Sequence, residues 1–248
     1  MARDEALARC TTTSGIPTLR LYRFDPPAIT LGRFQEFPGG IQTGDCQRYG
    51  IDLVRRPTGG LAILHHLDFT YSVTLPRDRR MPAERKRYFN TVAAGILGSL
   101  ELIGVKAELV DHRGPGRTVP TWCFDGVTGI DVEWEGRKIC GSAQRMFESS
   151  VLQHGSLFLD IDQKMLKRMT RGDETKGISP VTIKEVTERD VGWKELKSAF
   201  KNGFAESLGL YIEQGELSED EACLAERMRV EKYSNFEWLW KGLDTFRY

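Results

Sequence analysis

Short strand-like segments dominate the first two thirds of this sequence, and helical patterns dominate the rest. These segments are short, and several are bounded by turn signals such as Asp25-Pro26-Pro27, Pro57 and Glu135-Gly136. The segments with this pattern are 19–24, 28–33, 51–56, 61–64, 68–75, 128–135, 137–144 and a further strand from about 150 to 160. Such an order predicts an α+β, or mixed α/β, fold with one substantial sheet.

Three helices are expected from periodicity and end signals, besides a helix over Ala2 to Ala8 that has no N-cap before it. Residues 82–103 carry apolar side chains on one face, with proline at the start and Gly104 at the end. Residues 193–208 form a second helix. Ser218 and Glu221 form a capping-box pattern that opens a third, ending near Arg229. We expect a single domain over residues 1–248, with a helical C-terminal portion from about residue 172.

Composition excludes several classes of protein. Lys+Arg and Asp+Glu both number 35, and this zero net charge argues against a nucleic-acid partner. No stretch approaches about 20 consecutive apolar residues, and the charged first ten residues do not resemble a signal peptide. We therefore expect no membrane partner and a cytoplasmic location. With no coiled-coil pattern and no large apolar patch in view, we expect a monomer.

The cysteines point to a reducing compartment. There are five, at positions 10, 46, 123, 140 and 223, and no two form a C-x-x-C pair. An odd, scattered set does not form a disulfide framework, and it does not combine with the four histidines at zinc-ligand spacing. The sequence predicts no metal and no cofactor, and it leaves at least one thiol free to react.

A glycine-containing loop is the first candidate binding element. Arg55, Arg56 and Pro57 end a strand and are followed by Thr58, Gly59 and Gly60. Glycines let the backbone approach a ligand, and arginine with exposed N–H groups suits a phosphate or a polarised carbonyl. The alternative is a hairpin bend with two surface arginines. The loop lacks the ending of a Walker A motif.

Two strand segments supply further candidates. In the first, Lys138 lies three residues before Gly141, Ser142 and Ala143, and Gln144 follows. Their small side chains leave room for a ligand; the alternative is an edge strand with a solvated lysine. In the second, His154, Gly155 and Ser156 precede an apolar run, where the histidine either lines a pocket or is structural.

Cys123 lies between Trp122 and Phe124, a setting typical of an inert core cysteine. A reactive cysteine needs a nearby cation to favour the thiolate, because an unperturbed thiol is only a few per cent ionised near pH 7. Lys138 is the candidate cation, if its strand lies beside the cysteine.

These elements, taken in order, resemble the biotin/lipoate protein ligase superfamily. The matching segments are Leu31-Gly32-Arg33-Phe34-Gln35, Arg55 to Gly60, Thr70-Tyr71-Ser72, Gly136-Arg137-Lys138, Gly141 to Gln144, Leu152 to Ser156, and Tyr233 to Trp238. The resemblance covers residues 1 to about 160 and the closing motif. It implies a class II aminoacyl-tRNA synthetase-like sheet with flanking helices.

Within that superfamily, Cys123-Phe124-Asp125 resembles the octanoyltransferases that load the glycine cleavage H protein. The resemblance implies that Cys123 takes octanoyl from octanoyl–acyl carrier protein as a thioester and passes it to a lysine of a lipoyl domain. Lys138 matches the lysine that favours the thiolate. Implied substrate-binding residues are Arg56, Thr58, Gly59, Gly60, His65, Gly141, Ser142, Ala143, Gln144, His154, Gly155 and Ser156.

Three other functions stay open: an ATP-dependent lipoate–protein ligase, an amidotransferase between two lipoyl domains, and a non-catalytic protein that docks lipoyl domains. The sequence also departs from the family pattern. His66 occupies the place of a usual Asp, with Asp68 nearby, and Leu61 replaces a third glycine common in ATP-dependent ligases. The strand that usually precedes Met1 is missing, which suggests a late start.

Overall fold

A six-stranded antiparallel sheet forms the centre of the molecule. The computed structural model describes residues 1–77, 85–112, 122, 130–170 and 180–247. The strand order is β1-β5-β9-β8-β7-β6. In that order the strands are β1 (Thr18–Tyr22), β5 (Asp68–Pro76), β9 (Ser150–Phe158), β8 (Arg137–Met146), β7 (Ile130–Trp134) and β6 (Glu108–Asp111). Each neighbouring pair is antiparallel.

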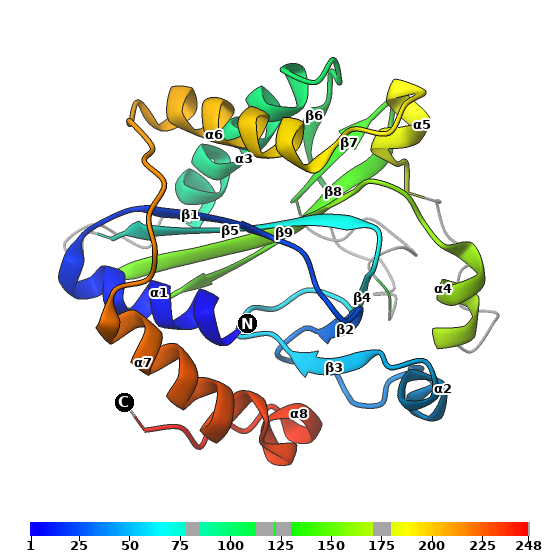
Figure 1. The fold of residues 1–248 in the computed structure, drawn as a ribbon, viewed down its shortest axis with the longest axis vertical. Coiled ribbons are helices and arrows are strands. Elements are labelled where there is room, and N and C mark those ends of the chain that lie inside the picture. Colours follow the sequence, from blue (N-terminus) through cyan, green and yellow to red (C-terminus); the bar gives the residue numbers. More distant parts are fainter. Residues whose placement is uncertain (78–84, 113–121, 123–129, 171–179, 248) are drawn as a thin grey trace.

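The two faces of this sheet differ in chemistry because side chains alternate along a strand. On β5, Phe69, Tyr71 and Val73 enter the main apolar core. Helices α3 (Arg85–Glu101) and α6 (Trp193–Leu208) cover that face, side by side in Figure 1, and α6 contributes Phe200 and Phe204 to the same core. The alternate residues of β5, from Asp68 to Thr74, are polar yet buried beneath the opposite layer.

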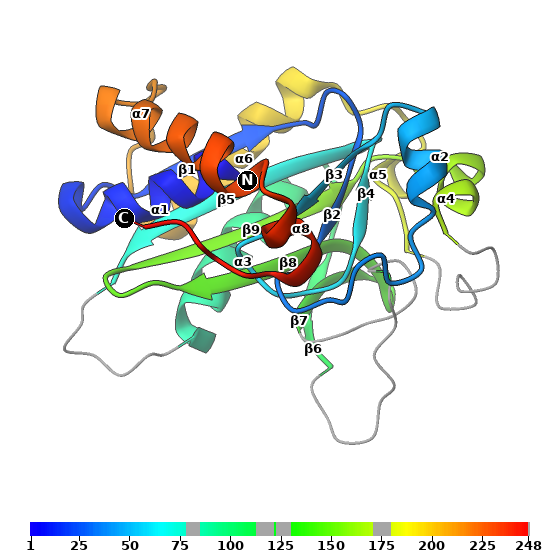
Figure 2. The same ribbon diagram turned by 90° about the horizontal axis from the view of Figure 1, so that it is seen from below.

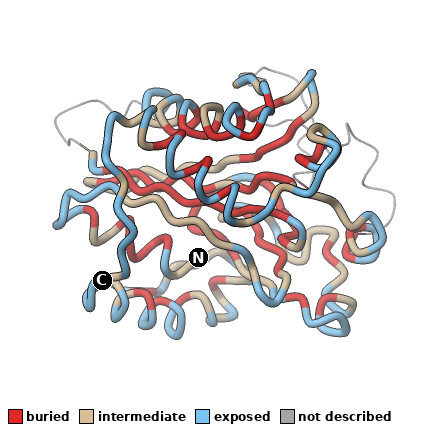
Figure 3. The backbone as a smooth tube through the Cα atoms, turned by 45° about the horizontal axis from the view of Figure 1, so that its top comes forward, coloured by how far each residue is buried: buried red, intermediate tan, exposed pale blue. Residues whose placement is uncertain are grey.

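The opposite layer is built from the chain's two ends and a small sheet. Helix α1 (Ala2–Ser14) packs against α7 (Glu219–Met228), and Figure 2 shows both lying across this face. The small sheet has the order β3-β2-β4. Its strands are β2 (Ala28–Leu31), β3 (Asp52–Arg55) and β4 (Ile63–His65). Figure 3 shows that the strands are mostly buried whereas the helices expose their outer sides.

Arg55 links the small sheet to the end of the chain. This side chain is 1% exposed. It donates to the carbonyls of Gly32 at 2.8 Å, Gln35 at 2.7 Å and Leu239 at 2.9 Å. In return, Trp238 Nε1 donates to the Arg55 carbonyl at 3.0 Å. The closing motif therefore packs on the segment that leads into the glycine loop, and the surface-arginine interpretation of Arg55 is wrong.

The predicted fold class is confirmed, and the long helices match the sequence closely. The capping box of Ser218 and Glu221 is present at the start of α7. Several short elements were not predicted from the sequence: α2 (Thr43–Arg48), α4 (Gln163–Met169), α5 (Ile183–Thr187), the π-helical turn η1 (Arg229–Tyr233), α8 (Phe236–Lys241) and β6. Over the described ranges, no helix is long and apolar enough to cross a membrane.

Candidate active site

A cavity of about 530 Å³, its open mouth included, lies between the main sheet and the small sheet. The lining mixes apolar and charged side chains. Among the described residues it comprises Met1, Tyr22, Arg56, Gly60, Leu61, Ile63, His65, Thr70, Asp131, Lys138, Gly141, Ser142, Ala143, His154, Gly155 and Ser156.

The glycine loop is shaped by Arg56, which is buried rather than on the surface. Its guanidinium donates to the carbonyls of Thr30 at 2.8 Å, Gly59 at 3.0 Å and Leu61 at 2.8 Å. Gly32 packs directly against the same loop, since a Cβ added to it would lie 1.9 Å from the Gly60 carbonyl oxygen. The loop is thus held by a charged clamp and by a close backbone contact that only glycine permits.

His65 supports Arg56 through a chain of hydrogen bonds. Its Nδ1 lies 2.6 Å from Asp68 Oδ2, and its Nε2 lies 3.0 Å from Thr30 Oγ1. Because an ionised carboxylate only accepts, Nδ1 carries a proton; Thr30 Oγ1, which contacts Nε2, also accepts from Arg56 at 2.7 Å. Although burial opposes ionisation, the charge and hydrogen bond of His65 lower the pKa of Asp68.

His154 supports the other side of the loop. Its Nε2 lies 2.6 Å from Thr58 Oγ1, and its Nδ1 lies 3.4 Å from Asp4 Oδ2. Asp4 also accepts from Arg20 at 2.6 Å and from Ser72 at 2.8 Å. Burial lowers the pKa of His154, so the ring is neutral near pH 7. Both histidines line the cavity while their ring nitrogens hold the loop.

Close packing of β5, β9 and β8 forms the floor of the cavity. Gly155 pairs with Tyr71 on one side and Ser142 on the other. A Cβ at Gly155 would lie 2.3 Å from the Gly141 carbonyl oxygen and 2.6 Å from the Tyr71 hydroxyl. The Tyr71 hydroxyl lies 2.5 Å from Ser142 Oγ. The small residues Gly141, Ser142 and Gly155 therefore allow the three strands to pack closely beneath the cavity.

Lys138 is a buried cation in the cavity wall, as Arg56 is, and not a solvated residue on an edge strand. It lies on β8, between β9 and β7, and is 5% exposed. Its Nζ lies 2.8 Å from Asp131 Oδ1, and Asp131 on β7 is 2% exposed. A register shift between Val132 and Glu133 interrupts the pairing of β7 with β8 here. Bulges of this kind re-aim side chains beside active sites.

Most of the predicted site residues come together around this cavity. Ten line it: Arg56, Gly60, His65, Lys138, Gly141, Ser142, Ala143, His154, Gly155 and Ser156. Thr58 and Gly59 lie directly behind the lining, bonded to His154 and Arg56. Gln144 contacts Gln153 at 3.1 Å. Cys123 lies outside the described residues; the residue before it, Trp122, is fully buried and bridges Ala62, between two cavity residues.

The cavity also contains residues that the sequence did not single out, above all Asp131 and Tyr22. Thr70, which belongs to a matching family motif but was not predicted as a site residue, also lines the cavity and is paired with Ser156 across β5 and β9. Asp131 had no local signal, since an acidic residue alternating with another on a strand is typical of a solvated face. Its burial becomes evident only from the register between β7 and β8.

The fold and the cavity place the chain among mixed α/β catalytic domains built on an antiparallel sheet. Residues 1–205 match the lipoyl protein ligase A/B catalytic domain. The chain belongs to that family, which confirms the resemblance seen in the sequence.

Relatives match along almost the whole chain. An octanoyltransferase LipM of Symbiobacterium thermophilum is 36% identical, covering 96% of this chain and 92% of the relative. An octanoyltransferase LipM of Bacillus subtilis is 32% identical, covering 97% and 93%. Among solved structures, a lipoate-protein ligase A bound with ATP superposes with a TM-score of 0.82 at 27% identity, covering 98% of this chain and 93% of that one. A bipartite lipoate protein ligase of Thermoplasma acidophilum, studied with its E2 lipoyl domain, gives a TM-score of 0.82 at 26% identity, covering 100% and 92%.

Proposed function

We propose that this chain is a monomeric, single-domain octanoyltransferase that acts in protein lipoylation through a Cys123 thioester. The octanoyl group comes from octanoyl–acyl carrier protein and goes to a lysine of a lipoyl domain, with the glycine cleavage H protein as the acceptor. The enzyme class rests on full-length relatives, which are octanoyltransferases at 31–36% identity. The ATP-dependent ligase is the weaker alternative, since its likeness is to structures at 26–27% identity.

The other cysteines support Cys123 as the nucleophile by their surroundings. Cys140 belongs to the apolar core, and Cys46 is buried beside Met169. Burial raises the pKa of Cys46 to about 11, and burial with the nearby charges of Glu221 and Asp220 raises that of Cys10. Cys223 is exposed on α7. None of these four described cysteines lines the cavity.

Lys138 supports Cys123 as the nucleophile because it can supply the positive charge that a thiolate needs. A thiolate needs positive charge near it, and Lys138 brings a buried ammonium to the cavity wall. An ammonium within about 4–6 Å of a thiol lowers its pKa by favouring the charged form. Conversion of one thioester into another is close to balanced, and conversion of a thioester into an amide is downhill, so ATP is not required. Covalent catalysis divides a transfer between two proteins into two easier steps.

The direct test is the donor requirement of the wild-type chain. Incubation with octanoyl–acyl carrier protein should give a mass gain of one octanoyl group, which peptide mapping should place on Cys123. Addition of an apo lipoyl-domain protein should then discharge the adduct onto a lysine without ATP. Activity that requires free octanoate, ATP and magnesium, with no protein adduct, would instead establish the ligase.

A second prediction concerns Lys138. Replacing it with alanine should raise the pH of half-maximal Cys123 alkylation by about 1 unit or more, because the cation is lost while the Asp131 carboxylate stays. Lys138→Arg keeps the charge but changes its shape, and it should retain more of the low-pH reactivity. Iodoacetamide labelling followed by peptide mass spectrometry measures both. Exposed Cys223 serves as the internal control, and an unchanged Cys123 profile would contradict the pairing.

A further inference from the structure

One oxygen of Asp131 stands out among the polar atoms of the cavity. Asp131 Oδ1 contacts Lys138 Nζ at 2.8 Å, but Oδ2 is buried without a hydrogen-bond partner in the part of the chain that the structure describes. A buried carboxylate oxygen left unpaired costs about 1–3 kcal/mol or more, so such an atom calls for an explanation. Other buried orphan atoms belong to residues such as Gln153 and Asp244, which do not line the cavity.

The position of Asp131 suggests that a bound ligand supplies the hydrogen-bond donor for Oδ2. Its side chain is 2% exposed, yet it lines the cavity together with Lys138. Lys138 already occupies one oxygen, so the second offers an acceptor to a ligand that carries an N–H or O–H group. Glu133, two positions along β7, differs in this respect: its carboxylate bonds to His112 and does not line the cavity.

The proposed reaction brings such a donor to the cavity in its second half. The acceptor lysine must enter as a free amine and attack the octanoyl thioester. As the C–N bond forms, positive charge develops on that nitrogen, and the amine protons become strong hydrogen-bond donors. A fixed negative oxygen that is shielded from water stabilises such charge far better than solvent does.

We propose that Asp131 is a catalytic residue for the acceptor half of the reaction, with Oδ2 accepting an N–H of the attacking lysine amine. The nitrogen lone pair forms the C–N bond, and the C–S bond breaks with its electron pair going to sulfur. One amine proton passes to Asp131 Oδ2. The products are an amide, a Cys123 thiolate and a neutral Asp131 carboxyl, which returns its proton to solvent. This inference rests on the octanoyltransferase function proposed above.

Lys138 and Asp131 stabilise charges on different atoms of the reaction. In this proposal Lys138 stabilises the sulfur, which carries negative charge as a thiolate in both halves of the reaction. Asp131 stabilises the nitrogen, where positive charge develops only in the second half. Loss of Lys138 should therefore slow both halves, whereas loss of the Asp131 charge should slow transfer to the acceptor selectively.

The two half-reactions of Asp131→Asn test this division. Asparagine keeps the size of the side chain, and its amide oxygen can still accept from Lys138. We expect Cys123 octanoylation by octanoyl–acyl carrier protein, followed by intact mass in a rapid-quench series, to stay within a few-fold of wild type. Transfer from the isolated acyl-enzyme to an apo lipoyl-domain protein should fall by about 10²–10⁴-fold, the usual contribution of a general acid–base group.

Two controls complete the experiment. Glu133→Gln makes the same carboxylate-to-amide change on the same strand, away from the cavity, and should leave the transfer rate near wild type. Hydroxylamine, a small nucleophile that is uncharged near neutral pH, should discharge the Asp131→Asn acyl-enzyme at close to the wild-type rate. Retained octanoylation by octanoyl–acyl carrier protein shows that the variant is folded.

Three outcomes would overturn the proposal. Unchanged transfer by Asp131→Asn would show that Oδ2 plays no part. An equal fall in both half-reactions would make Asp131 a positioning residue for Lys138. A hydroxylamine reaction slowed as much as protein transfer would indicate a general defect of the site. Absence of any adduct on wild-type Cys123 would instead contradict the proposed octanoyltransferase mechanism itself.

Discussion

Replacing Cys123 with alanine should abolish the acyl adduct and reduce octanoyl transfer to a lipoyl domain by about 10⁴-fold or more, because removal of a covalent nucleophile leaves only the contribution of substrate positioning. Cys123→Ser should fall almost as far, since a hydroxyl is a weak nucleophile without a general base. Intact mass spectrometry with octanoyl–acyl carrier protein measures the first step, and a gel-shift or mass assay of the acceptor measures the second.

The exposed thiol of Cys223 provides the matched control for this substitution. Cys223→Ser should leave both steps unchanged, because this residue lies on α7 and away from the cavity. Full transfer activity in Cys123→Ala would show that the acyl group never resides on this cysteine. A direct attack by the acceptor amine on the donor thioester would then have to replace the two-step route, with Lys138 and Asp131 still in the cavity.

The sequence was most informative where one local rule dominates. The helix over residues 193–208 was predicted at the bounds the structure shows, because Leu196, Phe200 and Phe204 repeat every four residues on one buried face. The ordered motifs likewise predicted the family, and ten of their residues surround one cavity. Motifs separated by tens of residues meet there because β5, β9 and β8 are neighbours in the sheet.

What the sequence could not supply was the partner of each buried charge. Charged residues such as Arg55, Asp4 and Lys138 are usually solvated. Only the three-dimensional structure shows that they are buried and which groups pair with them. Short elements such as α8 were missed because helices of one or two turns depend on packing more than on propensity. Pairing of Asp131 with Lys138 depends further on a bulge, for which the sequence carries no signal.

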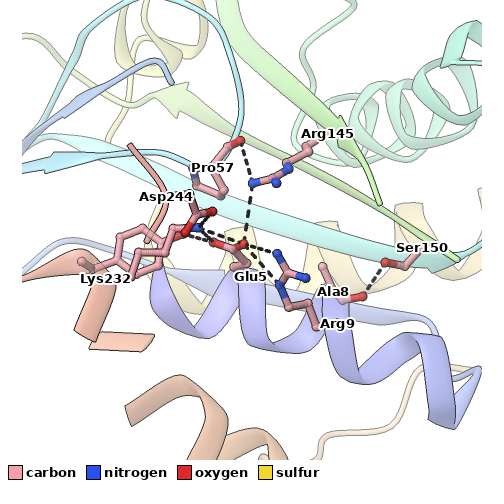
Figure 4. A network of polar contacts seen from close by, with 9 residues as sticks. Glu5, Ala8, Arg9, Pro57, Arg145, Ser150, Lys232 and Asp244 are labelled. Atoms are coloured by element: carbon pink, nitrogen blue, oxygen red, sulfur yellow. Dashed lines mark hydrogen bonds and ion pairs between the residues drawn. The ribbon is translucent and has the colours of Figure 1, made fainter. Parts of the chain in front are cut away.

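Replacing Lys232 with methionine should have the largest effect on stability. Lys232 lies in η1 and is 1% exposed. Its Nζ contacts Glu5 Oε2 at 2.9 Å and Asp244 Oδ2 at 2.6 Å, and Figure 4 shows it reaching from the C-terminal segment into helix α1. The Tyr233 hydroxyl donates to the same Glu5 oxygen at 2.6 Å.

Loss of this cation leaves two neighbouring carboxylates without their shared partner. Breaking one side of a buried ion pair costs about 3–5 kcal/mol, so the free energy of unfolding of Lys232→Met should fall by that amount. Urea denaturation at pH 7 measures it. Lys241→Met is the matched control: its pair with Glu237 is exposed, and its loss should cost at most about 1 kcal/mol.

The pH dependence of stability should identify the cause. Burial opposes ionisation of Glu5, but the charge and hydrogen bond of Lys232 lower the pKa of Glu5 from 4.5 to about 2. Because the folded-state pKa is depressed, the contribution of Glu5 is present in full above about pH 4.5 and is lost as the pH falls towards 2. That shift corresponds to roughly 3 kcal/mol.

In Lys232→Met this acid-side loss should shrink, because the pKa of Glu5 returns towards its ordinary value. The gap in unfolding free energy between wild type and variant should therefore be wide at pH 7 and narrow near pH 3. Adding Glu5→Gln to Lys232→Met should recover part of the loss, since it removes the buried carboxylate that has lost its lysine partner. A constant gap across this range, or no recovery in the double variant, would show that lost packing rather than lost charge accounts for the effect.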